Sequence, residues 1–126
     1  MQNILNQYNI RFSSPLNYGT HNRIDSINDW LSLFIEDHYS INEANRLLDG
    51  INEIINANDV TGGGFDTQSL YLAVINSTTT NIYDDLDAYV ENNSITPSYT
   101  LPTQDFKVIV QAWRDYLVQS PTTSRN

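Results

Sequence analysis

The strongest structural signal in this chain is an amphipathic helix that begins at a capping box. Ser40 stands three residues before Glu43, and in this arrangement each side chain can satisfy the other residue's backbone amide. The apolar residues that follow recur with helical spacing, at Ala44, Leu47, Leu48, Ile51, Ile54 and Ile55. The pattern predicts a helix that ends within residues 56–59. Gly50 lowers its helix propensity by about 1 kcal/mol relative to alanine, which indicates that another element packs closely there.

Two further segments have the helical period. Residues 24–35 place their apolar side chains on one face, and Ser26 offers a start for this helix. The other helix follows Pro102, with Thr103 as its N-cap, and its apolar positions are Phe106, Ile109, Val110, Trp113 and Leu117. We expect that helix to end near Ser120 and the tail 121–126 to be disordered.

Strand signals occupy most of the remaining chain. Residues 70–75 are short, β-prone and bounded by turn residues, so they predict a strand. Residues 76–80 would turn the chain back into a return strand over 82–92, with a bulge or break at Asp84 and Asp85. Tyr8, Ile10 and Phe12 alternate and predict an N-terminal strand. The glycines 62–64 predict a flexible connection.

These elements predict one α+β domain over residues 1–120, with helices packed on one face of a small antiparallel sheet. The chain has 126 residues, of which 40% are hydrophobic. That size corresponds to one domain, which can bury roughly two-thirds of its unfolded surface. The sequence contains no cysteine, so neither a disulfide nor a thiolate zinc site can hold the fold together.

The charge balance narrows the class of partner. Fifteen acidic residues oppose six basic ones, for a formal net charge of −9. Nucleic acids and anionic membranes attract clustered Lys and Arg, which this chain lacks, so we expect it to bind neither. A basic protein is the natural complement. The N-terminus has no signal-peptide pattern, and we expect a soluble, cytoplasmic protein that is a monomer.

No motif for catalysis, a cofactor or a metal stands out. The glycines 62–64 lack the lysine of a phosphate-binding loop, and the acidic residues 84–91 do not have the spacing of a calcium-binding loop. His21 and His38 have no partner motif in the sequence. We therefore expect a protein that is not an enzyme and holds no cofactor. A carboxylate-dependent hydrolase stays open as an alternative, because carboxylate pairs are assembled in space.

A resemblance points to a function. The stretch Leu101–Phe106, running into Val110–Leu117, contains a proline, a threonine cap, an aromatic residue and a helix with tryptophan and leucine. It resembles the ending of small bacterial immunity proteins of contact-dependent inhibition and other polymorphic toxin systems. The resemblance covers the last quarter of the chain. It implies a protein that neutralises a cognate toxin, such as a nuclease, by covering its active site or substrate groove.

For that role we expect an acidic contact surface with tyrosine. If residues 82–92 form a strand, alternation places Asp85, Asp87, Tyr89 and Glu91 on one face. The first candidate surface is this set together with Asp84 and Asp66. The second is the polar face of the helix after Ser40, with Asp49, Asn52, Glu53 and Asn56. Other interpretations remain open: an acidic inhibitor that mimics nucleic acid, or an adaptor module.

Overall fold

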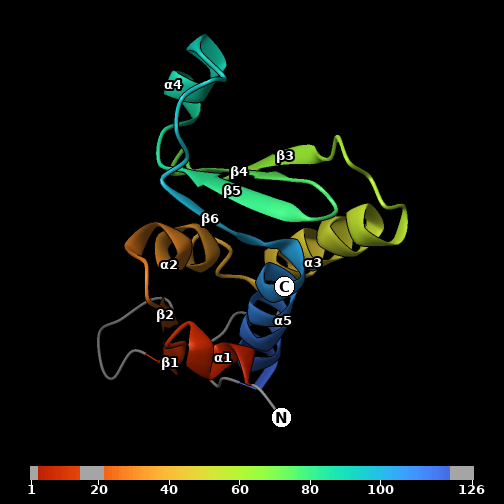
Figure 1. The fold of residues 1–126 in the computed structure, drawn as a ribbon. Coiled ribbons are helices and arrows are strands. Elements are labelled where there is room, and N and C mark those ends of the chain that lie inside the picture. The colour runs from red at the N-terminus through yellow and green to blue at the C-terminus, as the bar shows by residue number, and fades with distance from the viewer. Residues whose placement is uncertain (1–2, 15–21, 120–126) are drawn as a thin grey trace.

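The computed structural model describes residues 3–14 and 22–119. Their elements, in chain order, are α1 (Ile4–Gln7), β1 (Arg11–Ser13), β2 (Arg23–Asp25), α2 (Asp29–Glu36), α3 (Ile41–Asn56), β3 (Gly63–Asp66), β4 (Leu72–Ile75), β5 (Thr79–Tyr83), α4 (Leu86–Glu91), β6 (Tyr99–Pro102) and α5 (Thr103–Gln119). The fold is a single α+β domain, which confirms the predicted class (Figure 1).

Four strands form an antiparallel sheet in the order β3-β4-β5-β6, and β1 pairs with β2 in a separate ribbon. The register sets Phe65 opposite Ala73, Ala73 opposite Ile82, and Ile82 opposite Tyr99. Because side chains alternate along a strand, these residues share one face of the sheet. The helices α2, α3 and α5 lie on that face (Figure 1).

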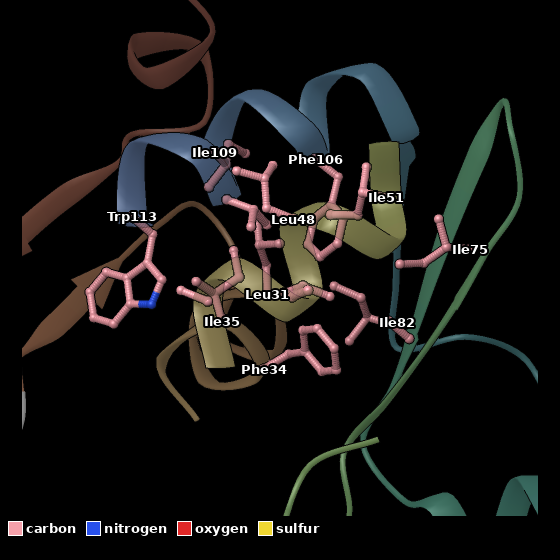
Figure 2. Close-up of a cluster of buried hydrophobic side chains, with 14 of the residues drawn as sticks. Leu31, Phe34, Ile35, Leu48, Ile51, Ile75, Ile82, Phe106, Ile109 and Trp113 are labelled. Carbon is pink, nitrogen blue, oxygen red and sulfur yellow. The ribbon is translucent and has the colours of Figure 1, made fainter. Parts of the chain in front are cut away.

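The hydrophobic core lies between this sheet face and the three helices. Figure 2 shows side chains of α2, α3 and α5 converging on Ile75 and Ile82 of the sheet. Leu31, Ile51, Phe106 and Trp113 have no exposed surface, with values of 0%. The apolar stripes predicted on the helices therefore face a common core. The sheet covers one side of that core and the three helices cover the other.

The helix α3 follows its prediction closely. The amide of Glu43 donates to the hydroxyl of Ser40 at 3.1 Å, which is one half of the predicted capping box, and the Glu43 carboxylate accepts from the Ser40 hydroxyl at 3.4 Å. The helix ends at Asn56, with Ala57 as its C-cap. Gly50 is packed against Phe65 of β3, so the expectation of close packing at that glycine is confirmed.

The predicted return strand over 82–92 is wrong beyond Tyr83. The strand β5 ends there, and Asp85 becomes the N-cap of α4, with its carboxylate accepting the amide of Ala88 at 3.2 Å. Aspartate is a poor strand residue and a good N-cap. The two aspartates therefore end the strand, and residues 86–91 form a helix despite their strand-like alternation. Asp85, Asp87, Tyr89 and Glu91 therefore do not share a strand face.

The predicted helix over 24–35 begins too early. Residues 23–25 form β2, which pairs with β1, and α2 begins at Asp29. Asn28, and not Ser26, caps it: the Asn28 side chain accepts the amides of Trp30 and Leu31 at 2.9 and 3.1 Å. Ile24 fits the helical spacing, but its pairing with β1 places it in a strand, and its side chain is buried there.

Three other predictions need correction. The glycines expected in a flexible connection enter β3, because Gly63 and Gly64 pair with Ile75 and Val74. The N-terminal strand covers only the end of its predicted range, since Tyr8 is the C-cap of α1 and Asn9 has a positive φ of 54°. Thr103 is the first residue of α5 and its hydroxyl donates to the Asn76 carbonyl at 2.8 Å. The predictions for His21 and the tail 121–126 lie outside the described residues.

Candidate functional site

Most of the predicted contact residues lie on one projection of the fold. Residues 84–98, which we call the α4 arm, leave the sheet after β5 and return to it at β6 (Figure 1). Hydrogen bonds close its base: the Asp84 amide donates to the Ser98 hydroxyl at 3.2 Å, and this hydroxyl donates to the Asp84 carboxylate at 3.1 Å. The amide of Ser98 donates to the Ile82 carbonyl at 2.7 Å. The arm therefore extends from a defined base.

Aromatic packing connects α4 to the sheet. The rings of Tyr83 and Tyr89 lie 4.7 Å apart between centroids, on the sheet face that points away from the core helices. The amide of Leu86 donates to the Leu70 carbonyl at 2.9 Å. Burial, with a smaller contribution from Tyr89, raises the pKa of the Tyr83 phenol above its ordinary value. Tyr89 thus contributes to holding α4 in place, which is a structural role that its sequence context did not reveal.

The α4 arm carries negative charge without compensation. Asp84, Asp85, Asp87 and Glu91 are all exposed, and the segment 84–98 contains neither Lys nor Arg. Within residues 3–14 and 22–119 the only ion pair joins Arg114 to Asp115, which are neighbours on α5. None of the arm carboxylates is therefore neutralised by a basic side chain of the described chain.

The remaining predicted residues lie elsewhere. Asp66 stands opposite Leu72, which stands opposite Tyr83, so Asp66 lies at the same end of the sheet as the base of the α4 arm. Asp49 and Glu53 are exposed on α3, one helical turn apart. The fold thus brings Asp66 to the arm end of the sheet and keeps the α3 set separate from the arm.

A cavity that sequence reasoning missed lies between α3 and the edge of the sheet. Its volume is about 310 Å³, and its lining includes Glu43, Arg46, Phe65, Asp66 and Thr67. Asp37 and His38, from the end of α2, also line it. By register the Asp66 side chain shares the outer sheet face with Leu72 and Tyr83, so Asp66 lines the cavity through its backbone. The carboxylates of Asp37 and Glu43 outnumber the one guanidinium, that of Arg46, and this negative balance would suit a cationic group.

Hydrogen bonds position the α2 side of this cavity. The Asp37 carboxylate accepts from the amide and the hydroxyl of Ser69, at 3.3 and 3.2 Å. The Trp113 indole donates to the His38 carbonyl at 2.8 Å. Ser69 and Trp113 are both distant from α2 in sequence, so no local pattern could have indicated this arrangement.

His38 is neutral in this environment. Its Nδ1 lies 2.9 Å from the Phe34 carbonyl, and because a carbonyl can only accept, Nδ1 carries the proton. Burial lowers the pKa of His38 below its ordinary value, and the backbone hydrogen bond and nearby carboxylates only partly oppose that shift. His38 therefore adds no positive charge to the cavity near neutral pH.

The described residues include no group of three or more His, Cys, Asp or Glu side chains placed to hold a metal ion. None of the helices in this part of the chain has the length and apolar character needed to cross a membrane. Comparisons with protein-family models, with curated protein sequences and with solved structures each find no match.

Proposed function

We propose that this chain is a cytoplasmic immunity protein, without catalytic activity of its own, that neutralises a basic toxin domain by binding it. The observation that supports this most is the α4 arm, which presents four exposed carboxylates with no basic partner on a projection of the fold. The C-terminal resemblance to immunity proteins supports the same class.

Electrostatics explains why such an arm suits an inhibitor. Nuclease toxins need a positive groove to bind nucleic acid, and a field of opposite sign accelerates encounter with that groove. The exposed Val90, at 73%, adds an apolar contact beside Asp87 and Glu91. Interfaces combine such apolar contacts with a polar rim. The arm would enter the substrate groove of the toxin and exclude its substrate.

One observation favours the alternative of a carboxylate-dependent hydrolase, namely the cavity with Asp37, Glu43 and Asp66 in its lining. Two of these carboxylates already have structural partners: Asp37 accepts from Ser69, and Glu43 accepts from the Ser40 hydroxyl at 3.4 Å. Such roles favour a binding cavity over a catalytic one. An inhibitor that mimics nucleic acid would need rows of carboxylates, whereas the strongest group here is confined to one arm.

The decisive experiment is a binding titration against the C-terminal domain encoded by the gene immediately upstream. We expect tight binding that abolishes the toxicity of that domain in cells. A neighbour that is harmless when expressed alone and does not bind this chain would refute the proposed function.

Two variants test the surface. Asp87→Lys with Glu91→Lys reverses two exposed arm charges and leaves Asp84 and Asp85, which hold the arm, unchanged. We expect association with the toxin to slow by about tenfold or more at low salt, with a smaller effect at high salt. The control, Asp25→Lys with Asp29→Lys, changes the net charge equally at β2 and α2 and should have little effect. Equal effects of both pairs would exclude the arm as the contact surface.

A further inference from the structure

The strand β3 forms an open edge of the four-stranded sheet. Thr67 donates its amide to the Tyr71 carbonyl at 2.9 Å. In an antiparallel ladder the bonding residues alternate, so Phe65 and Gly63 bond to β4 while the amides and carbonyls of Gly64 and Asp66 point away from it. These outward groups have no backbone partner within the described residues.

The short strand β3 has one charged residue, Asp66, and neither the lysine nor the proline that often protects a sheet edge. Natural sheet edges are shielded by lysine, proline, bulges or covering elements. Here Gly64 and Asp66 are exposed, and a Cβ added at Gly63 would meet no atom within 4 Å. An additional strand could therefore approach the β3 backbone without displacing a side chain at the glycines.

Contacts with neighbouring residues also fix β3 in an extended conformation. The Phe65 ring packs on α3 at Gly50, and the Gly62 amide donates to the Asp59 carboxylate at 2.8 Å. The glycine at 62 is required, since it has a φ of 71° and a Cβ there would lie 1.7 Å from the Ile75 carbonyl oxygen. A strand that adds to β3 thus meets an ordered template, which reduces the entropy cost of binding.

The cavity lies along the same edge. Gly64, Phe65 and Asp66 contribute one part of its lining, and Glu43 and Arg46 of α3 contribute another. Its volume of about 310 Å³ is at the small end of the range for ligand sites, roughly 300–1,000 Å³. It fits one long side chain of a bound strand, because alternate residues of that strand point toward the helical layer.

We infer that β3 receives an extended, basic segment of a partner protein as a fifth strand, with a Lys or Arg side chain entering this cavity. The negative balance of the lining selects a cation, and the backbone edge supplies hydrogen bonds that do not depend on side chains. A second copy of this chain fits poorly: each copy carries a net charge of −9, and the edge strand itself carries the exposed Asp66. This inference goes beyond the proposed function, because it holds for any basic partner.

The test uses the full chain and a synthetic probe, the blocked heptapeptide Ac-Thr-Val-Thr-Lys-Thr-Val-Thr-NH2. In a ¹⁵N NMR titration at millimolar peptide, we expect saturable shifts at the amides of Gly64 and Asp66. The same peptide with Glu in place of Lys should bind at least about tenfold more weakly. Absence of shifts at these amides, or equal binding of the two peptides, would overturn the inference.

Variants separate the edge from the cavity. Gly64→Pro removes an outward amide, which an edge strand tolerates, and should abolish binding with the spectrum of the core unchanged. Glu43→Gln keeps a side-chain acceptor for the cap of α3 and removes one cavity charge. It should weaken binding of the Lys peptide by about threefold or more. Asp25→Asn, at an exposed position of β2 that does not line the cavity, removes one carboxylate charge elsewhere and is the control, which should leave binding unchanged.

Two further outcomes bear on the identity of the occupant. If sedimentation shows that the parent chain is a dimer and that Gly64→Pro is a monomer, the edge binds a second copy and the inference is overturned. Failure of the toxin to bind, with the Lys peptide still bound at β3, would refute the proposed function alone.

Discussion

The ring of Phe65 lies on the backbone of Gly50, so close that a Cβ added to Gly50 would be 2.5 Å from the Phe65 Cε2 atom. This contact joins the edge strand β3 to the helix α3. It explains why a residue of poor helix propensity stands within α3: the ring occupies the space that a side chain at 50 would need.

We predict that Gly50→Ala destabilises the protein by about 1–2 kcal/mol. The overpacking of the ring outweighs the gain of about 1 kcal/mol in helix propensity. In a Phe65→Ala background the sign should reverse, and Gly50→Ala should stabilise by about 1 kcal/mol. Urea unfolding of the four proteins measures this cycle, and a stabilising Gly50→Ala in the parent chain would contradict the steric explanation.

Thr103 makes a second test of packing. It is fully buried, its hydroxyl donates to the Asn76 carbonyl at 2.8 Å, and it lies 2.9 Å from the Thr80 hydroxyl. Thr103→Val leaves buried polar groups of two residues unsatisfied, so we expect a loss of about 1–3 kcal/mol. Thr100→Ser, on the exposed side of β6, is the control. Equal stability of Thr103→Val and the parent in urea would show that the hydroxyl pair contributes nothing.

The lowered pKa of His38 predicts a pH dependence of stability. Because the folded pKa lies below the ordinary 6.5, the unfolded state binds more protons as the pH falls through this range. The contribution to stability is therefore complete above 6.5 and is lost as the pH falls toward the folded pKa. The imidazole NMR signals should show one histidine that titrates below 6.5, and this signal should vanish in His38→Gln. Stability that rises on acidification through this range would contradict the burial.

The pair Tyr8 and Asp105 predicts the opposite behaviour at high pH. The Tyr8 hydroxyl donates to the Asp105 carboxylate at 2.7 Å, and burial, followed by that hydrogen bond and charge, raises the pKa of the phenol. The contribution is complete below the ordinary value of about 10 and is lost as the pH rises toward the folded pKa.

We expect Tyr8→Phe to reduce the free energy of unfolding at neutral pH by about 2 kcal/mol, because the hydrogen bond involves a charged acceptor. The variant should also show a smaller loss of stability above about pH 10. Tyr71→Phe is a suitable control, since no hydrogen bond of the Tyr71 hydroxyl is found within the described residues. If both variants unfold at the same urea concentration as the parent, the Tyr8–Asp105 contact is not formed.

The candidate site was predictable only in part. The carboxylates of the α4 arm form a group because they are neighbours in sequence, and exposure of a group this polar is the ordinary outcome. Their arrangement was not predictable, since a run as short as 86–91 is compatible with a strand or a helix. The cap made by Asp85 and the packing of Tyr89 on Tyr83 favour the helix α4 over a strand.

The sequence by itself determined the long helices and the class of the fold. The stripe of α3 and its capping box involve residues within a few positions of one another, so local hydrogen bonds and periodicity specify them. Tertiary structure alone decided that glycines 63 and 64 form an edge strand and that Asp37 meets Ser69 beside the cavity. These contacts join segments that are distant along the chain, and they form only when burial of the common core brings those segments together.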